Sequence, residues 1–501
     1  MKHTSRRAFL KLSTVAGLGL ALPHWSFGQG AGQKRFGPND QVNLGIIGLG
    51  GLNVVGGVGG RGRQLIDQIR RVPGVRITAL CDVDSAVLDH SAKEFKERGE
   101  KVATYRDLRQ VLDDKQVDAV AVALPNHWHA LATVWACQAA KHVYVEKPFA
   151  QNIWEGRQMV AAARRCGRIV QVGTQSRSSA ALREAFAYLQ QGDLGSIRYA
   201  HALVYRPRES IGRVNGPGAI PAHIDYDLWC GPVSKMPLNR KQLHYEWHWF
   251  WSTGNGEVGN NGVHVIDVCR WALGVDQPRR AMSVGGRFAF DDPAETPNTQ
   301  IAFLDFGKVP VICEVRNLRV RPGSDARGKF RNREGGIVID CADGYAAGDS
   351  SAVAIYDRQG KIVKEYKDAP ADLPVEARHL GNFFAAVRSG NDAELAADAT
   401  QGHYSATACH MANLSQRLGK AASPEQIKEV MQTDPEQADA FERCREHLQD
   451  NGVNLAETPA SLGPWLTLDP ARDRFTGSFA DEANQLSRRV DRPPFVVPEL
   501  A

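Results

Sequence analysis

One stretch near the start of the chain limits the fold more than any other. An apolar run over 42–47 is followed by the glycine-rich segment 48–51, an amphipathic pattern over 61–72 and a second apolar run over 75–81. Apolar runs of strand length on either side of a helical pattern predict a βαβ unit. Two strands joined through a helix lie parallel, and helices cover both faces of parallel sheets, so the stretch predicts an α/β fold.

The glycine-rich turn and the residue after the second strand predict a dinucleotide site. Gly48, Gly50 and Gly51 allow the backbone to approach a pyrophosphate closely, and Asp82 stands where a carboxylate accepts from ribose hydroxyls. A carboxylate at that place repels a 2′-phosphate. We therefore expect NAD, although a nearby Arg would admit NADP as well.

An insertion over 52–59 interrupts this motif. The strict spacing puts Asn53 where the third glycine should stand, so the glycine that packs the strand against the helix is either Gly60 or Gly62. A glycine motif alone also occurs in flexible loops. Arg61, at the start of the helical pattern, is expected to contact the cofactor.

A third apolar run, over 117–124, leads into a Pro-Asn-His-Trp-His segment. Ligands bind outside the carboxyl ends of the strands in such sheets, so we assign Pro125, Asn126 and His129 to the cofactor. Asn126 is also expected to cap the next helix. His127 and His129 do not share a helix face, so they line the cleft or an exposed turn and make a poor metal site.

A fourth run, over 142–145, ends in Glu146, Lys147 and Pro148, and the proline stops the strand abruptly. Lys147 is therefore expected to point into the same cleft, where a desolvated amine with a lowered pKa exchanges a proton near neutral pH. We expect Lys147 to be catalytic, and both Glu146 and Lys147 to contact the cofactor.

The second half of the chain has a different pattern. Strand-like runs without intervening helices predict a predominantly antiparallel sheet in an α+β domain. An insertion over 206–251 is rich in aromatic residues. Aromatic plates among polar side chains suit sugars, so Tyr226 and Trp229 are assigned to the substrate. His244 and His248 stand four residues apart, but no third ligand is near and no metal is expected.

The order of these motifs, from the glycine turn through Asp82 and the Glu-Lys-Pro strand end to a later segment at 259–267, resembles the glucose-fructose oxidoreductase, inositol dehydrogenase and rhizopine-catabolism family, Gfo/Idh/MocA. The resemblance runs from about Val42 to Gly419. It implies an N-terminal Rossmann domain and a C-terminal mixed sheet whose face covers the cofactor. It also implies hydride transfer between NAD(P) and a carbon of a sugar or cyclitol.

The resemblance assigns roles in the later segment and exposes one departure. His264 would be a second catalytic acid/base there. Asp267, on the same helix face, and Arg177, earlier in the chain, are our own assignments to the substrate. Members of the family often have an Asp four residues before this His, where the present chain has Asn260. Because an amide cannot exchange a proton, Asn260 is expected only to orient the substrate, leaving Lys147 or His264 as the acid/base.

The first 28 residues are expected to be a twin-arginine export signal. Arg6 and Arg7 precede an apolar stretch over 12–22 and a small-x-small cleavage site at 26–28 or 30–32. This route exports folded proteins, which suits a protein that acquires its cofactor in the cytoplasm. We therefore expect a periplasmic or otherwise exported protein, with the export machinery as a partner.

Removal of the signal would leave the charge nearly balanced. The chain has 61 Lys and Arg against 56 Asp and Glu, and four of the cations lie in the signal, which leaves 57. This balance gives no support for nucleic acid or an anionic membrane as a partner. The nine cysteines form no Cys-x-x-Cys pair, which argues against a disulfide framework and a zinc site. No integral membrane anchor is expected beyond the signal.

The chain is expected to have four segments: the signal (1–28), a Rossmann dinucleotide-binding domain (41–173), a substrate-binding α+β domain (174–420) and a C-terminal tail (421–501). The tail has one long predicted helix, over 424–450. We expect it to pack on the core or to form a subunit contact in a homo-oligomer.

Together these features predict an exported, NAD-dependent oxidoreductase that acts on a sugar or sugar derivative. A compartment without free nicotinamide cofactor favours a tightly held one that is reduced and reoxidised within each cycle. Two other functions stay open. One is a glycosidase or lyase that oxidises the sugar transiently, eliminates and returns the hydride. The other is a non-catalytic sugar-binding protein that keeps the Rossmann fold as a scaffold.

Overall fold

The computed structural model describes residues 37, 40–52, 59–368 and 373–501. The predicted signal over 1–28 lies outside the described residues, and so does most of the insertion in the glycine turn. Within the described ranges, no helix has both the length and the apolarity needed to cross a bilayer.

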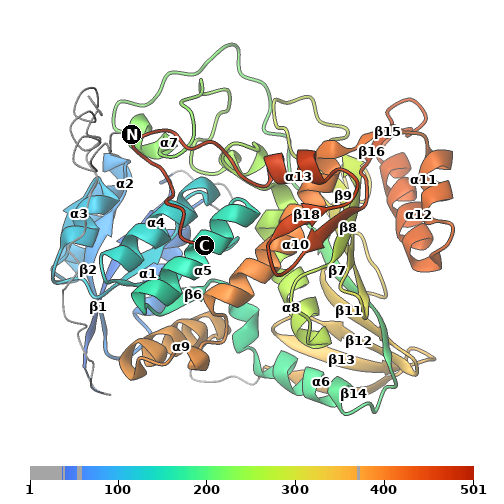
Figure 1. Ribbon diagram of the computed structural model, residues 1–501, viewed down its shortest axis with the longest axis horizontal. Helices are drawn as coiled ribbons and strands as arrows, with labels where there is room; N and C mark the ends of the chain where they lie inside the picture. Colours follow the sequence, from blue (N-terminus) through green and yellow to red (C-terminus); the bar gives the residue numbers. More distant parts are fainter. Residues whose placement is uncertain (1–36, 38–39, 53–58, 369–372) are drawn as a thin grey trace, which may run out of the picture. The chain divides into compact units, whose positions relative to one another are not determined.

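The first domain has the predicted Rossmann architecture (Figure 1). Its described strands form one parallel sheet in the order β3-β2-β1-β4-β5-β6. Strands β1, β4 and β5 are buried along almost their whole length because helices cover both faces. The strands are β1 (Val42–Ile47), β2 (Val75–Cys81), β3 (Ala103–Tyr105), β4 (Ala119–Val122), β5 (His142–Val145) and β6 (Val170–Val172). The helices are α1 (Arg61–Ile69), α2 (Ser85–Glu97), α3 (Leu108–Asp113), α4 (Asn126–Gln138) and α5 (Ile153–Cys166).

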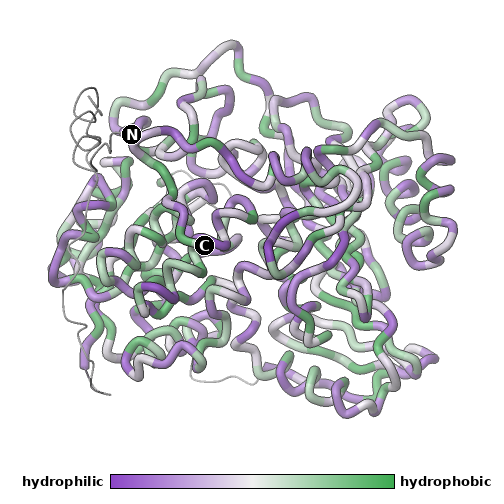
Figure 2. Tube along the Cα trace, viewed as in Figure 1, coloured by the Kyte–Doolittle hydropathy of each residue, from purple (hydrophilic) through white to green (hydrophobic). Residues whose placement is uncertain are grey.

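A helix from far along the chain completes this domain. Helix α9 (Val375–Ser389) buries Leu380, Phe383 and Phe384 in one core with β1 and α1. Hydrophobic residues follow the strands, whereas hydrophilic residues recur along the outer helices (Figure 2). The apolar face of α9 therefore covers sheet surface that the first 174 residues leave open.

The geometry of the glycine turn shows which of Gly60 and Gly62 is the third glycine of the motif. A Cβ on Gly62 would overlap the carbonyl oxygen of Gly48, whereas one on Gly60 would meet only the flexible end of Arg63. Gly62 therefore allows α1 to pack on the turn, and it completes the motif. The inserted loop starts and ends at one place, because the Gly51 amide donates to the Gly59 carbonyl at 2.9 Å.

The second domain contains the predicted, mostly antiparallel sheet. Its described strands run in the order β14-β13-β12-β11-β7-β10-β9-β8-β16-β15, and β17 pairs with β8 and β18. The β7–β10 pair is parallel and the others are antiparallel. The strands are β7 (Ile197–Tyr205), β8 (Arg280–Gly286), β9 (Thr299–Asp305), β10 (Pro310–Arg316), β11 (Gly336–Cys341), β12 (Gly344–Gly348), β13 (Ala352–Asp357), β14 (Ile362–Lys367), β15 (Lys420–Ala422), β16 (Ala460–Leu462), β17 (Leu466–Asp469) and β18 (Arg474–Thr476).

Helices pack on this sheet and connect it to the first domain (Figure 1). Helices α6 (Ala180–Gln190), α8 (Val263–Leu273) and α10 (Ala399–Leu418) bury their apolar residues against it in the largest core. Helix α10 also contacts α5 of the Rossmann domain. The two domains therefore share a packed boundary, and this boundary is where the carboxyl ends of the Rossmann strands lie.

The tail differs from its prediction in two ways. The single helix expected over 424–450 is two helices, α11 (Pro424–Met431) and α12 (Pro435–Asp450), because Pro435 cannot continue the first one and Asp434 caps the second. In addition, β16, β17 and β18 extend the second sheet, so the tail is part of that domain's structure.

The last segment of the chain, red in Figure 1, follows α13 (Ala480–Leu486) and runs back to α4 and α5 of the Rossmann domain. Phe495 packs edge-on against Trp128 at 5.5 Å between ring centroids. The amides of Leu500 and Ala501 donate to Gln158 at 2.5 and 2.9 Å. The C-terminus is thereby fixed to the domain that the N-terminal half builds.

Candidate active site

A cavity of about 440 Å³ lies at the carboxyl ends of the Rossmann strands. One wall is the glycine turn, Asp82, Pro125 and the end of β5; the other belongs to the second domain. The full lining is Ile47, Gly48, Gly50, Gly59, Arg61, Gln64, Cys81, Asp82, Val83, Arg106, Asp107, Leu108, Ala123, Leu124, Pro125, Trp128, Glu146, Lys147, Arg206, Arg208, Leu228, Trp229, His244, Tyr245, Trp247, His248, Asn260 and Asn261. We call it the dinucleotide cavity.

The glycine turn fits a dinucleotide. Gly48 and Gly50 have φ of +90° and +82°, which side chains rarely adopt, and a Cβ on Gly50 would overlap the Gly59 carbonyl. Asp82 is held at the end of β2, because its two oxygens accept from the amides of Leu49 at 2.7 Å and Asp84 at 2.9 Å. Its carboxylate therefore faces the cavity in a fixed position, as a ribose contact requires.

The aromatic insertion covers this turn. His244 Nε2 lies 2.9 Å from the Asp84 carboxylate, directly after β2. A Cβ on Gly51 would lie 2.8 Å from the His244 ring, so the insertion packs tightly on the turn. The insertion therefore forms part of the wall opposite the Rossmann strands, and the cavity stays partly open.

Lys147 lies at the end of β5, and its amine is held by one residue. Its Nζ donates to the backbone oxygen of Asn260 at 2.8 Å and to the side-chain oxygen at 2.9 Å. Asn260 belongs to the π-helical turn Val258–Gly262 that leads into α8, an irregularity often found at functional sites. Burial lowers the pKa of Lys147 to about 8, although the Glu146 carboxylate opposes the shift. An amine of this kind exchanges protons near neutral pH.

A second cavity meets the first at Lys147. It is lined by Arg61, Glu146, Lys147, Gln175, Ser176, His264, Ser350, Val375 and Glu376. Burial, reinforced by the neighbouring Lys147 charge, lowers the pKa of His264 well below its ordinary value. His264 is therefore a neutral imidazole that shares a cavity with Lys147. We call this the His264 cavity.

An ion pair fixes the boundary between the two cavities. Arg61 Nε lies 2.7 Å from Glu146 Oε1, and the same guanidinium pairs with Glu376. Both predicted cofactor residues line the dinucleotide cavity. Arg61 thus joins α1 of the Rossmann domain to β5 and to the start of α9.

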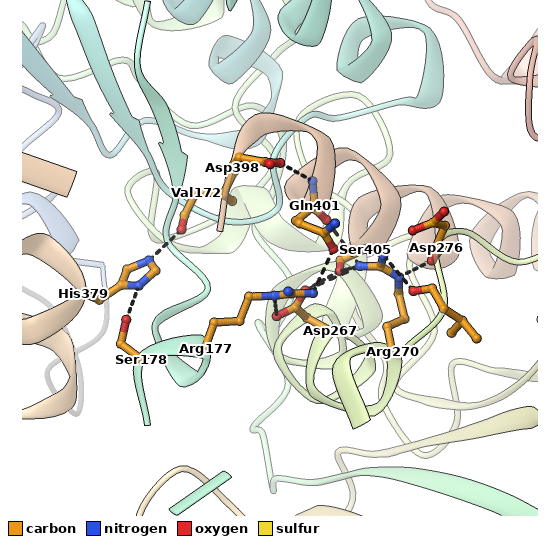
Figure 3. Close-up of polar contacts among 11 residues, drawn as sticks. Val172, Arg177, Ser178, Asp267, Arg270, Asp276, His379, Asp398, Gln401 and Ser405 are labelled. Carbon is orange, nitrogen blue, oxygen red and sulfur yellow. Dashed lines mark hydrogen bonds and ion pairs between the residues drawn. The ribbon is translucent and has the colours of Figure 1, made fainter. Parts of the chain in front are cut away.

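The structure corrects the assignment of Asp267 and Arg177 to the substrate (Figure 3). Arg177 Nε lies 2.8 Å from Asp267 Oδ2, and Asp267 also accepts from Ser405 Oγ at 2.6 Å and lies 3.6 Å from Arg270. Asp267 is 1% exposed, and neither it nor Arg177 lines either cavity. A buried carboxylate needs its full set of partners, so this pair holds α8 to α10 instead.

Tyr226 also lies outside both cavities. Its hydroxyl donates to the Met236 carbonyl at 2.7 Å, and its ring stacks on Trp229 with centroids 5.7 Å apart. Trp229 does line the dinucleotide cavity, and Arg240 lies over its ring, 5.0 Å from the centroid. Tyr226 therefore supports the wall that Trp229 forms, and its assignment to the substrate is corrected.

The segment after β4 needs three further corrections. Helix α4 begins at Asn126, which forms no cap; its Nδ2 donates to Asn255 Oδ1 at 2.8 Å. His129 places its ring nitrogens 2.7 and 2.8 Å from the carbonyls of Pro148 and Leu124. Neither Asn126 nor His129 lines the dinucleotide cavity, so both position the loops around it. Pro125 does line it, as predicted.

Sequence reasoning missed a pair in the insertion. Tyr245 and His248 line the dinucleotide cavity, and the Tyr245 side chain contacts Asn260. His248 Nδ1 donates to the Tyr245 carbonyl at 2.6 Å, which leaves Nε2 as an acceptor. Burial lowers the pKa of His248 to about 3, so this acceptor is uncharged. The available signal was a Tyr and a His three residues apart in a helical turn, which places both on one face.

In the described part of the chain, no three His, Cys, Asp or Glu side chains are grouped to hold a metal ion.

Family models match both domains. Residues 42–174 match a model described as an oxidoreductase family with an NAD-binding Rossmann fold. Residues 211–285 match a model of the C-terminal alpha/beta domain of the same oxidoreductase family. The first match covers the sheet that carries the glycine turn, and the second covers the insertion, Asn260 and α8.

Curated relatives match over part of their length. A glycosyl hydrolase family 109 protein from Solibacter usitatus is 36% identical over 169 residues, which are 31% of this chain and 36% of the relative. A glycosyl hydrolase family 109 protein from Shewanella sp. strain ANA-3 is 30% identical over 270 residues, 48% of this chain and 57% of the relative. The chain thus spans about half the length, or less, of these relatives.

Solved structures share the fold. The WlbA dehydrogenase of Bordetella pertussis, solved with NADH and UDP-GlcNAcA, has a TM-score of 0.53 and 20% identity over 74% of this chain and 96% of that one. A levoglucosan dehydrogenase with NADH and levoglucosan has a TM-score of 0.56 and 16% identity, with coverage of 74% and 96%. Residues 42–174 and 211–285 thus resemble the two domains of the Gfo/Idh/MocA oxidoreductase family, and these solved structures share the fold.

Proposed function

We propose that the protein is an NAD-dependent oxidoreductase that transfers hydride to or from a carbon of a sugar or sugar derivative. The observation that carries the proposal is the position of Lys147, whose pKa is about 8, at the junction of the dinucleotide and His264 cavities. NAD, when bound, supplies the hydride acceptor or donor. Proton transfer is left to the chain's own side chains.

The contacts of Lys147 suit it to act as a base on a substrate hydroxyl. A neutral lysine amine has two N–H groups and one lone pair, and Asn260 offers it two oxygens. With both N–H groups directed at Asn260, the lone pair points away from that residue. Lys147 would therefore take the hydroxyl proton as the carbon gives up its hydride, and the ammonium form would return it to a carbonyl oxygen in reduction.

His264 would act from the other cavity. Because its imidazole is neutral, it can accept a hydrogen bond from a second hydroxyl of the same sugar. Asn260 has no proton to exchange and would act by orienting Lys147.

Export through the twin-arginine pathway and retention of the cofactor are part of the same proposal. The contact of His244 with the glycine turn covers part of the dinucleotide cavity, which suits a cofactor that stays bound outside the cytoplasm. Replacing Arg6 and Arg7 with Lys should keep the precursor in the cytoplasm, as fractionation with an antibody would show. Normal export of that variant would contradict the signal.

We also propose that the protein acts as a homo-oligomer.

A second function deserves a test because a second acid/base pair lines the dinucleotide cavity. Transient oxidation to a ketone acidifies the C–H on the neighbouring carbon, whose proton a base can remove while the leaving group departs from the next carbon. Water then adds, and the hydride returns, so the net reaction is hydrolysis. Tyr245 and neutral His248 could supply the proton donor and the base. The names of the curated relatives also support this reaction.

The deciding experiment follows the absorbance of bound nicotinamide after the purified protein is mixed with sugars and with glycosides, together with product analysis. An oxidoreductase should remain reduced until a carbonyl substrate arrives. A glycosidase should cleave the glycoside with no lasting change in the cofactor. Sugar binding with neither response would favour the non-catalytic alternative, and the absence of any bound nicotinamide would contradict both enzymatic proposals.

A further inference from the structure

The charged residues that line the dinucleotide cavity are unevenly distributed between its walls. The acids, Asp82, Asp107 and Glu146, belong to the Rossmann domain. Within the described lining, the second domain contributes Arg206 and Arg208 and no acid. The wall opposite the Rossmann strands is therefore positively charged.

Arg208 is neutralised within the protein. Its Nη2 and Nε lie 3.0 and 3.2 Å from the two oxygens of Glu257, which is buried. Its guanidinium also lies over the rings of Tyr245 and Trp249, 5.7 and 5.5 Å from their centroids. Arg208 therefore supports the wall, and its charge is already balanced.

Arg206 is anchored by its backbone and keeps its charge. Its amide donates to the Arg316 carbonyl at 3.0 Å, and its carbonyl accepts from Asn317 Nδ2 at 2.8 Å. Its Nη1 lies 3.4 Å from Asn261 Oδ1, a long contact with a neutral group. Asn261 donates its own amide hydrogen to Glu257, which fixes the oxygen toward Arg206. No carboxylate of the described chain lies within ion-pair distance of Arg206.

Arg206 is exposed, and it lines the cavity beside the segment that holds Lys147. Its contact, Asn261, directly follows Asn260, which holds Lys147. A molecule whose hydroxyl meets Lys147 can therefore reach Arg206 with a second group. A planar guanidinium binds carboxylates through two parallel hydrogen bonds, and such charge-assisted bonds are the strong ones.

We propose that Arg206 determines specificity by binding a carboxylate on the substrate, so that the sugar is a uronic acid or a uronate-containing derivative. This inference rests on the proposed function and names its substrate class. A sulfate ester on the substrate would present similar negatively charged oxygens to Arg206. The phosphates of the cofactor are the other anions in this cavity that Arg206 could bind. The glycine turn already provides for those phosphates at the start of α1.

The test compares D-glucuronate with D-glucose, glucuronamide and glucose 6-sulfate on the NAD-loaded protein. Binding is measured by quenching of tryptophan fluorescence, and turnover by reduction of the bound cofactor. The wild type should favour glucuronate over glucose and glucuronamide by about tenfold to hundredfold in kcat/KM, the scale of a hydrogen bond to a charged group. Arg206→Gln should remove that preference by raising the KM for glucuronate. Arg321→Gln, an exposed Arg outside both cavities, is the matched control.

Each failure has a separate meaning. Equal handling of glucose and glucuronate by the wild type would overturn the inference while the proposed function stands. A preference for glucose 6-sulfate over glucuronate would contradict the claim that the substrate group is a carboxylate. Weaker NAD binding in Arg206→Gln would show that Arg206 binds the cofactor instead. If glucuronate binds in an Arg206-dependent way but the cofactor is never reduced, the proposed oxidoreductase function is contradicted. The assignment of uronates as the ligand class would then still hold.

Discussion

Lys147 Nζ lies 2.8 Å from the backbone oxygen and 2.9 Å from the side-chain oxygen of Asn260, so one neutral residue takes both N–H groups of the proposed base. The resemblance seen in the sequence leads one to expect an aspartate at this place. The difference is one of charge at nearly constant shape. It therefore affects the proton affinity of Lys147 more than its position.

Substitution of this residue should move the pH dependence of the reaction. Asn260→Asp puts a negative charge 2.9 Å from the amine, which favours the ammonium form and raises the pKa of Lys147 above about 8. The pH at which sugar oxidation is half-maximal should rise by roughly one unit or more. Profiles of kcat/KM against pH would measure the shift, with Asn454→Asp on an exposed loop as the control. An unchanged midpoint would show that Lys147 is not the titrating group.

The wild type should show opposite pH dependences in the two directions of the reaction. Oxidation needs the neutral amine, so its rate should rise with pH and level off above about 8. Reduction needs the ammonium form as a donor, so its rate should fall as pH rises through the same value.

Lys147→Ala should lower turnover by a factor on the order of 100 or more and retain bound NAD. Loss of the cofactor with no fall in rate per bound NAD would assign Lys147 to binding alone.

The cofactor preference should depend on Asp82. Asp82→Ala removes the carboxylate at the end of β2, so NAD should bind more weakly and discrimination against NADP should decrease. The amides of Leu49 and Asp84 would also lose their acceptor, which costs about 1–3 kcal/mol for a buried group. Titration of both cofactors into apoprotein measures the ratio of affinities. If that ratio stays the same while the free energy of unfolding falls, Asp82 stabilises the glycine turn and does not bind the ribose.

The fold and the site differ in how far the sequence predicts them. Strands β1, β2 and β5 have their predicted bounds, because each is a local apolar run followed directly by Gly or by a charged residue. The break at Pro435 had a local signal that a long helical pattern concealed. Lys147 could be placed because a strand end fixes the direction of the residue that follows it.

Other assignments depend on partners that are distant in sequence. Asp267 has the spacing of a site residue, but Ser405 and Arg177 surround it in the fold, 138 and 90 residues away. Tyr245 and His248 have a spacing that places them on one face of a turn, but the spacing does not say that this face meets the cavity. Polar residues near a site are therefore the hardest to assign, since either a ligand or the protein can satisfy them.

The Arg177–Asp267 pair should contribute to stability and not to turnover. Asp267→Asn leaves Arg177 buried without its counter-charge, and breaking a buried pair from one side costs about 3–5 kcal/mol. The exposed pair Arg280–Asp305 offers the control, because Asp305→Asn should cost at most about 1 kcal/mol. Denaturant unfolding measures both variants. A large fall in kcat of the folded Asp267→Asn protein would restore the residue to the active site.

The C-terminal segment should support the wall of the dinucleotide cavity from behind. Arg492 donates to the carbonyls of Gly231 and Val233 at 3.0 and 3.1 Å, and to the Asp227 carboxylate at 2.8 Å. These residues continue the turn that carries Trp229, which lines the cavity. Arg492→Met keeps the apolar stem and leaves the carbonyls without a donor, so the Trp229 wall should loosen.

We expect the KM for a sugar substrate to rise several-fold in Arg492→Met, with kcat nearly unchanged, because positioning of the wall is lost and the acid/base groups are not. Arg488→Met is the control, since Arg488 lies in the same segment but over Trp154, on α5 and outside the dinucleotide cavity. Steady-state kinetics of the two variants at equal cofactor loading gives the comparison. Equal effects from both would mean that the segment stabilises the domain generally and that the Trp229 wall does not depend on it.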